Sequence, residues 1–186
     1  RGWRRRGRGP TAMPNLNNAL RGALLSLALT GAILPATTQV VSAAQEVNIV
    51  EGYAVHGYDV VAYFTEGKPV LGNNSYTAEH GGATYRFASA EHRDLFAANP
   101  AKYAPQYGGF CAFGTAMGRK FDGDPQAWAI VDDRLYLNLN KDVQAKWKGN
   151  IPGFLKGAEN NWPLIRNLAD SRLEASPPAG VTLGAQ

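Results

Sequence analysis

The chain has 186 residues, of which 45% are hydrophobic and 18% charged, with 21 glycines, 11 prolines and a single cysteine. This composition indicates a globular domain with additional terminal segments, and it excludes a disordered, a collagen-like or a disulfide-stabilised protein. Six of the 19 basic residues precede residue 45, where no acidic residue occurs. The rest of the chain carries 13 basic and 15 acidic residues, and this mild negative charge argues against nucleic-acid binding.

Residues 1–44 have the order of a secretory signal peptide. Arginines precede an uncharged apolar run, Gly22–Leu34, and small residues follow it at Val41–Ala44. This run is shorter than the roughly 20 residues that a membrane-spanning helix needs. We therefore expect cleavage after Ala43 or Ala44, a periplasmic or secreted protein, and no stable membrane insertion afterwards. A buried core helix and an uncleaved membrane anchor are the alternatives.

The strongest local pattern in the body of the chain predicts a β-hairpin. Residues 75–80 and 83–88 alternate in polarity on either side of Gly81 and Gly82, a pair that is typical of a tight hairpin turn. A helix is expected from Ser89, an N-cap residue, to Ala98, because Asn99 and a proline follow.

Further elements are expected in the residues that follow. Residues 103–107 are expected to form an aromatic loop, and residues 110–117 a short, tightly packed turn of helix. Residues 128–137 alternate around Asp132 and Asp133 and predict a second hairpin, and Lys141–Lys148 predict an amphipathic helix that ends at Gly149. Residues 171–186, with two adjacent prolines and no aromatic residue, are expected to be disordered.

Together these patterns predict an α+β fold in which small antiparallel β-hairpins pack with short helices. One domain is expected over residues 46–166.

The absence of several well-known motifs limits the kinds of reaction and ligand that we expect for this protein. The sequence has no Gly-Lys-Ser/Thr phosphate loop, no Gly-x-Gly-x-x-Gly, no His-Glu-x-x-His and no Cys-x-x-Cys. Nucleotide chemistry is therefore not expected. A site for a soft metal would have to use His56, His80, His92 or Cys111.

Cys111 is the first of these candidates. Its place after Gly108 and Gly109, near the first turn of the expected helix, favours a thiolate that could act as a ligand or a nucleophile. The alternative is a buried, inert thiol that packs between Phe110 and Phe113.

Two histidines are further candidates. His92 lies in the first turn of the helix that begins at Ser89, so its ring points either to solvent or toward the loop that bears Cys111. His56 lies in the segment Val55–Asp59, where Gly57 suggests a turn, and Asp59 could orient its imidazole by accepting the second N–H. An exposed turn histidine is the alternative for His56. We expect His80 to be solvated, with no role.

Several segments resemble the YHS domain family, in particular its small exported single-domain members. The resemblance covers about residues 52–165 and is carried by Gly57–Asp59, Val61–Phe64, Glu66–Val70, Tyr85–Ser89, His92, Phe96, Asn99–Tyr103 and Pro105–Ala112. It implies metal handling, with copper as the usual suggestion, because similar units precede copper-transporting ATPases. Those units have two cysteines at the places that Ala88 and His92 occupy here.

These observations lead us to expect an exported metal-binding protein for copper, with zinc or iron as further possibilities. His92 and Cys111 are the expected ligands, about 4 Å apart if they share an ion, and His56 or Asp59 could complete the site. A redox or hydrolytic enzyme that uses Cys111 or a bound metal is one alternative, and a structural interaction module is another. The sequence favours a protein that is not an enzyme, because its densest carboxylate group is explained by turns.

Overall fold

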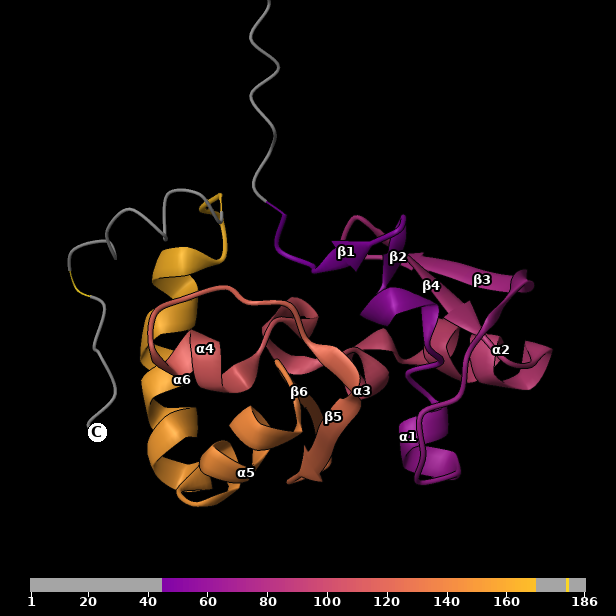
Figure 1. Ribbon diagram of the computed structural model, residues 1–186. Coiled ribbons are helices and arrows are strands. Elements are labelled where there is room, and N and C mark those ends of the chain that lie inside the picture. The colour runs from indigo at the N-terminus through magenta and orange to yellow at the C-terminus, as the bar shows by residue number, and fades with distance from the viewer. Residues whose placement is uncertain (1–44, 170–179, 181–186) are drawn as a thin grey trace, which may run out of the picture. The chain divides into compact units, whose positions relative to one another are not determined.

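The computed structural model describes residues 45–169 and residue 180 (Figure 1). Its elements in chain order are β1 (Ile49–Val50), β2 (Tyr53–Ala54), the 3-10 helix η1 (Val55–Gly57), α1 (Ala62–Thr65), β3 (Asn73–His80), β4 (Ala83–Phe87), α2 (Ala90–Ala98), α3 (Pro100–Tyr103), the 3-10 helix η2 (Gln106–Gly109), α4 (Ala112–Ala116), β5 (Asp124–Val131), β6 (Arg134–Asn138), α5 (Lys141–Lys148) and α6 (Ile151–Ile165). Within these residues the strands pair as three separate antiparallel hairpins. The predicted α+β fold of small hairpins and short helices is confirmed.

The hairpin β3–β4 forms where the alternation and the two glycines predict it. His80 pairs with Ala83 across the turn, and Gly81 and Gly82 both have positive φ angles, of 59° and 77°. Tyr85 and Phe87 share the buried face of β4, as the period of two requires. The hairpin therefore presents one apolar face to the core.

The helix α2 begins at the predicted cap. The Ser89 hydroxyl accepts a hydrogen bond from the amide of His92 at 3.1 Å, which satisfies one of the free amides of the first turn. Asn99 ends α2 and also caps α3, in which Pro100 occupies the first turn. Residues 103–107, which were expected to be an aromatic loop, therefore include the end of α3 and the start of η2.

The second hairpin and the helix that follows it also match the prediction. The strands β5 and β6 turn at Asp132 and Asp133, whose φ angles of 49° and 57° are those of a tight two-residue turn. The helix α5 is capped by Asn140 and buries Gln144 and Trp147.

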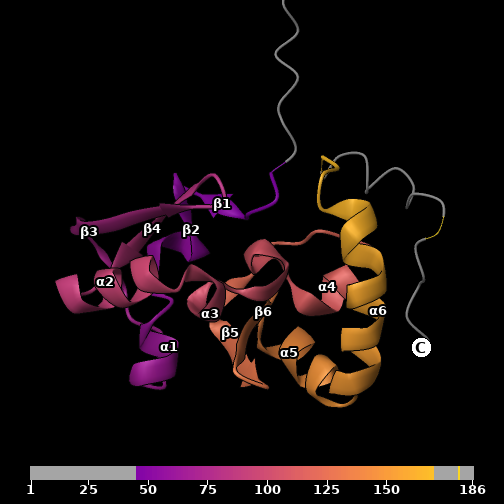
Figure 2. The same ribbon diagram turned by 180° about the vertical axis from the view of Figure 1, so that it is seen from behind.

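The helix α6 was not predicted. Its sequence contains Gly153, Gly157 and Pro163, which are poor helix formers, so local propensity gave no signal for a helix of this length. It packs along α4 and also contacts α5, as both views show (Figures 1 and 2). Ala158, Asn161 and Ile165 are buried by this packing. Tertiary contacts therefore override the weak propensity.

The buried apolar residues form two clusters. The first core is made of Val47, Ala54, Val55, Val60, Val61, Tyr63, Ala83, Tyr85, Phe87, Phe96, Tyr103, Leu135 and Leu137. The second core is made of Tyr107, Ala112, Ala116, Tyr136, Trp147 and Ala158. The strand β6 contributes alternate residues to both, so it joins the two cores.

No helix in the described part of the chain is long and apolar enough to cross a membrane. The expected signal peptide, residues 1–44, and the expected disordered tail, residues 171–186, lie outside the described residues, apart from residue 180.

Candidate functional site

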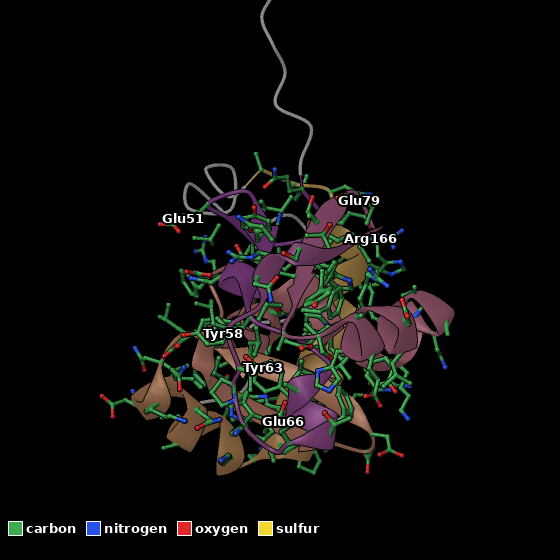
Figure 3. The ribbon with its side chains drawn as sticks, turned by 90° about the vertical axis from the view of Figure 1, so that its right-hand side faces the viewer. Glu51, Tyr58, Tyr63, Glu66, Glu79 and Arg166 are labelled. Atoms are coloured by element: carbon green, nitrogen blue, oxygen red, sulfur yellow. The ribbon has the colours of Figure 1, made fainter. Side chains whose placement is uncertain are left out.

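The carboxylate of Asp59 is the centre of the candidate site. Asp59 is fully buried, and it lies just before α1, where the chain turns into the helix. Its Oδ1 accepts hydrogen bonds from the amides of Val61 (2.9 Å) and Ala62 (3.3 Å), and its Oδ2 accepts one from the amide of Ala88 (2.9 Å). These amides compensate for the cost of burying the carboxylate. Figure 3 places this turn by the labelled side chains of Tyr58, before it, and Tyr63, on α1.

Asp59 also holds the imidazole of His92. The Nδ1 atom of His92 lies 2.6 Å from Asp59 Oδ2, and only 13% of the His92 side chain is exposed. Because the ionised carboxylate only accepts hydrogen bonds, the proton of a neutral imidazole lies on Nδ1. The lone pair of Nε2 is then free to accept a proton or a metal ion.

The other ring nitrogen of His92 faces a hydroxyl group. Nε2 lies 3.3 Å from Oγ1 of Thr65, the last residue of α1. The Thr65 hydroxyl also donates to the carbonyl of Val61, at 3.1 Å. A chain of polar groups therefore runs from Asp59 through His92 to Thr65.

This geometry corrects the role expected for Asp59 and the direction expected for His92. Asp59 orients His92 and not His56. The His92 ring does not point to solvent, since its side chain is only 13% exposed, and its polar partners are Asp59 and Thr65.

His56 forms a second pair, with a carboxylate from another part of the chain. Its Nε2 lies 2.8 Å from Oδ1 of Asp122, and the same oxygen accepts a hydrogen bond from the side-chain amide of Asn48 at 2.5 Å. Both Val55 and His56 have positive φ angles, of 50° and 53°. Such a backbone is strained, above all for the β-branched valine.

Cys111 has different partners and is fully buried. It is the N-cap of α4, where its Sγ accepts a hydrogen bond from the amide of Gly114 at 3.3 Å. Its Sγ also lies 3.9 Å from Oδ1 of Asn138, to which the thiol donates. Burial raises the pKa of the Cys111 thiol, and the Gly114 amide only partly opposes this effect.

The thiolate that was expected from the helix N-terminus is therefore disfavoured, and the environment of Cys111 matches the alternative of a buried, inert thiol. Cys111 and His92 share no hydrogen-bond partner.

The donor set fits a metal site with one imidazole, and it does not fit a closed site of three or four protein ligands. Among the described residues no group of three or more His, Cys, Asp and Glu side chains could hold a metal ion. His92 Nε2 is the best single donor, since its ring is fixed by a buried carboxylate.

Sequence reasoning missed Thr65, Asp122 and Asn48. The pairs Asp59–His92 and His56–Asp122 join residues that are 33 and 66 positions apart, so no local motif marks them.

Comparison of the chain with protein-family models, with curated proteins and with solved structures found no match.

Proposed function

We propose that this protein is an exported metal-binding protein that holds copper, or another soft or borderline transition metal ion, at Nε2 of His92. The observation that carries the proposal is the 2.6 Å contact between His92 Nδ1 and the buried carboxylate of Asp59. Histidines that bind metals usually donate their second N–H to such a carboxylate, which fixes the ring and makes the ligating nitrogen more basic. The apolar run at residues 22–34 supports the export part of the proposal.

A site of this kind binds its ion weakly and exchanges it readily. The remaining positions around the ion would be taken by water or by donors of another molecule. Closed zinc sites with four protein ligands retain their ion far more firmly. A single fixed imidazole therefore suits a protein that transfers a metal ion to another molecule, rather than a protein whose folding depends on the ion.

The test is titration of the full chain, without a histidine tag, with Cu(II), followed by electron paramagnetic resonance. We expect the spectrum of a copper ion with one imidazole nitrogen, and we expect His92→Ala to remove it. Asp59→Asn, which retains the imidazole but loses the ionised carboxylate, should weaken binding by about 10- to 100-fold.

His56→Ala is the matched control, because His56 is also paired with a carboxylate, at 2.8 Å. It should leave the copper spectrum unchanged, and so should Cys111→Ser, since the thiol is buried. A copper signal that survives in His92→Ala and is lost in His56→Ala would contradict the proposal.

A second function, hydrolysis of an ester or amide, is favoured by the contact between Thr65 Oγ1 and His92 Nε2. A hydroxyl, an imidazole and a buried carboxylate in this order are the parts of a nucleophile with its general base. The contact is long, at 3.3 Å, and the hydroxyl has the Val61 carbonyl as another acceptor, so we place this function second. Thr65→Ala separates the two: it should abolish turnover of p-nitrophenyl acetate and leave copper binding intact.

A further inference from the structure

A second feature of the molecule lies apart from the residues around His92. It is a cavity of about 210 Å³, and it is lined by Glu46, Val47, His80, Gly81, Tyr85, Ala104, Pro105, Gly108 and Trp162. These residues come from the segment before β1, the β3–β4 turn, the loop before η2, η2 itself and α6. None of them belongs to the polar chain from Asp59 to Thr65.

The close approach of two backbone segments forms one wall of this cavity. Gly108 has a φ angle of 60°, and a Cβ atom on it would collide with the carbonyl of Glu46. The amide of Asn48 donates to the Gly108 carbonyl at 2.8 Å, which holds the two segments together. Glu46 is thereby fixed beside the loop that carries Pro105.

The charge of the lining is negative. Glu46 is the carboxylate among the lining residues, and Arg166 pairs with it only loosely, at 3.9 Å between Arg166 Nε and Glu46 Oε1. Both side chains are about half exposed. Arg166 is labelled in Figure 3 and does not line the cavity. The carboxylate therefore has room to accept a second cationic partner.

The walls are aromatic and apolar. Trp162 and Tyr85 provide ring systems, and Val47 and Pro105 provide aliphatic surface. The indole of tryptophan attracts a cation to its face more strongly than the other aromatic side chains do. Cavities of this composition, with aromatic rings and one carboxylate, suit substituted ammonium groups.

Tyr85 adds a polar group to the cavity. Its side chain lines the cavity but is only 1% exposed, because its ring packs in the first core against Phe96. Burial raises the pKa of Tyr85 to about 12, so the hydroxyl stays neutral at ordinary pH and can donate to a ligand. A ligand with a cationic head would pair with the carboxylate of Glu46.

We infer that this cavity binds a small organic ammonium cation between the carboxylate of Glu46 and the ring of Trp162. This site is independent of the proposed metal site, because no residue is shared between them.

The test uses two probes of the same shape, choline and its uncharged analogue 3,3-dimethylbutan-1-ol. Binding to the full chain is measured by ligand-detected nuclear magnetic resonance and by calorimetry through the millimolar range. We expect saturable binding of choline and none of the alcohol. Equal binding of the two probes, or no saturation with choline, would overturn the inference.

Variants test the assigned residues. Glu46→Gln should weaken choline binding by at least about threefold, and Trp162→Leu by about tenfold. Arg166→Gln should tighten binding, because it removes the competing cation. If Trp162→Leu unfolds the protein, Trp162→Phe retains an aromatic ring and should still weaken binding.

Glu51→Gln is the matched control, since Glu51 is an exposed carboxylate that lies outside the cavity lining (Figure 3). It removes the same charge from the same part of the chain and should leave choline binding unchanged. An equal loss in Glu51→Gln and Glu46→Gln would show a general charge effect and would contradict the site.

Discussion

At Cys111, burial and a helix N-terminus act on one thiol in opposite directions. The Gly114 amide donates to Sγ, which favours the thiolate, while the loss of solvent favours the neutral thiol and raises the pKa. The desolvation effect is the larger. A thiol in this state is a weak nucleophile and a poor ligand, and for this reason the proposed metal site does not include it.

This raised pKa makes a prediction about stability at alkaline pH. The unfolded chain loses the thiol proton near pH 9 while the folded chain retains it, so ionisation favours the unfolded state as the pH rises. Between pH 7.5 and 9.5 the free energy of unfolding of the wild type should fall by about 1 kcal/mol more than that of Cys111→Ala. Urea unfolding at the two pH values measures this difference. The tyrosines are the same in both proteins, so an equal fall in both would contradict the prediction.

The candidate site could be predicted from the sequence only in part. The residue types and the cap at Ser89 place His92 in the first turn of a helix, and this placement is confirmed. The partner of its ring could not be predicted, because Asp59 is 33 positions away and reaches it only through the tertiary fold. The same limit applies to the pair of His56 and Asp122.

At the scale of elements, the hairpins were predictable and α6 was not, for a physical reason. The turns at Gly81–Gly82 and Asp132–Asp133 have local signals, since only a few residue types adopt a positive φ readily. The signal for α6 is not local, because its stability comes from side chains far away in the sequence. Asn161 Nδ2, for example, donates to the carbonyl of Ala116 at 3.0 Å.

Lys120 is the clearest case of such a distant contact. It is 7% exposed, and its Nζ donates to the carbonyls of Leu168 (3.0 Å) and Arg166 (3.5 Å), just after α6, and to that of Gln45 (2.9 Å). A cation at the C-terminus of a helix also interacts favourably with the helix dipole. Lys120 therefore joins the end of α6 to the start of the described chain.

Substitution of this lysine should destabilise the protein. Lys120→Met retains the aliphatic stem but leaves the carbonyls without their charged donor, so we expect the free energy of unfolding to fall by about 2 kcal/mol. Lys148→Met, at an exposed lysine in the last turn of α5, is the matched control and should change it by less than about 0.5 kcal/mol. Urea unfolding measures both. Equal free energies of unfolding for the two variants would show that the Lys120 contacts do not stabilise the fold.

At the scale of the whole described molecule, β6 couples the two cores. Leu135 and Leu137 point into the first core, and Tyr136, between them, belongs to the second. This division follows from the alternation of side chains along a strand. The sequence predicted the strand but not that both of its faces would be buried, because the covering residues come from other elements, among them η2, α4 and α5.

Because β6 is shared, the two cores should unfold in one cooperative transition. Leu135→Ala removes buried volume from the first core and should lower the free energy of unfolding by about 2–5 kcal/mol. The indole N–H resonance of Trp147, in the second core, should lose its native position at the same urea concentration as the ring resonances of Phe96, in the first. Leu139→Ala, at a residue that is 40% exposed directly after β6, is the control and should change stability by less than about 0.5 kcal/mol. Persistence of the native Trp147 resonance after those of Phe96 are lost would mean that the cores unfold separately.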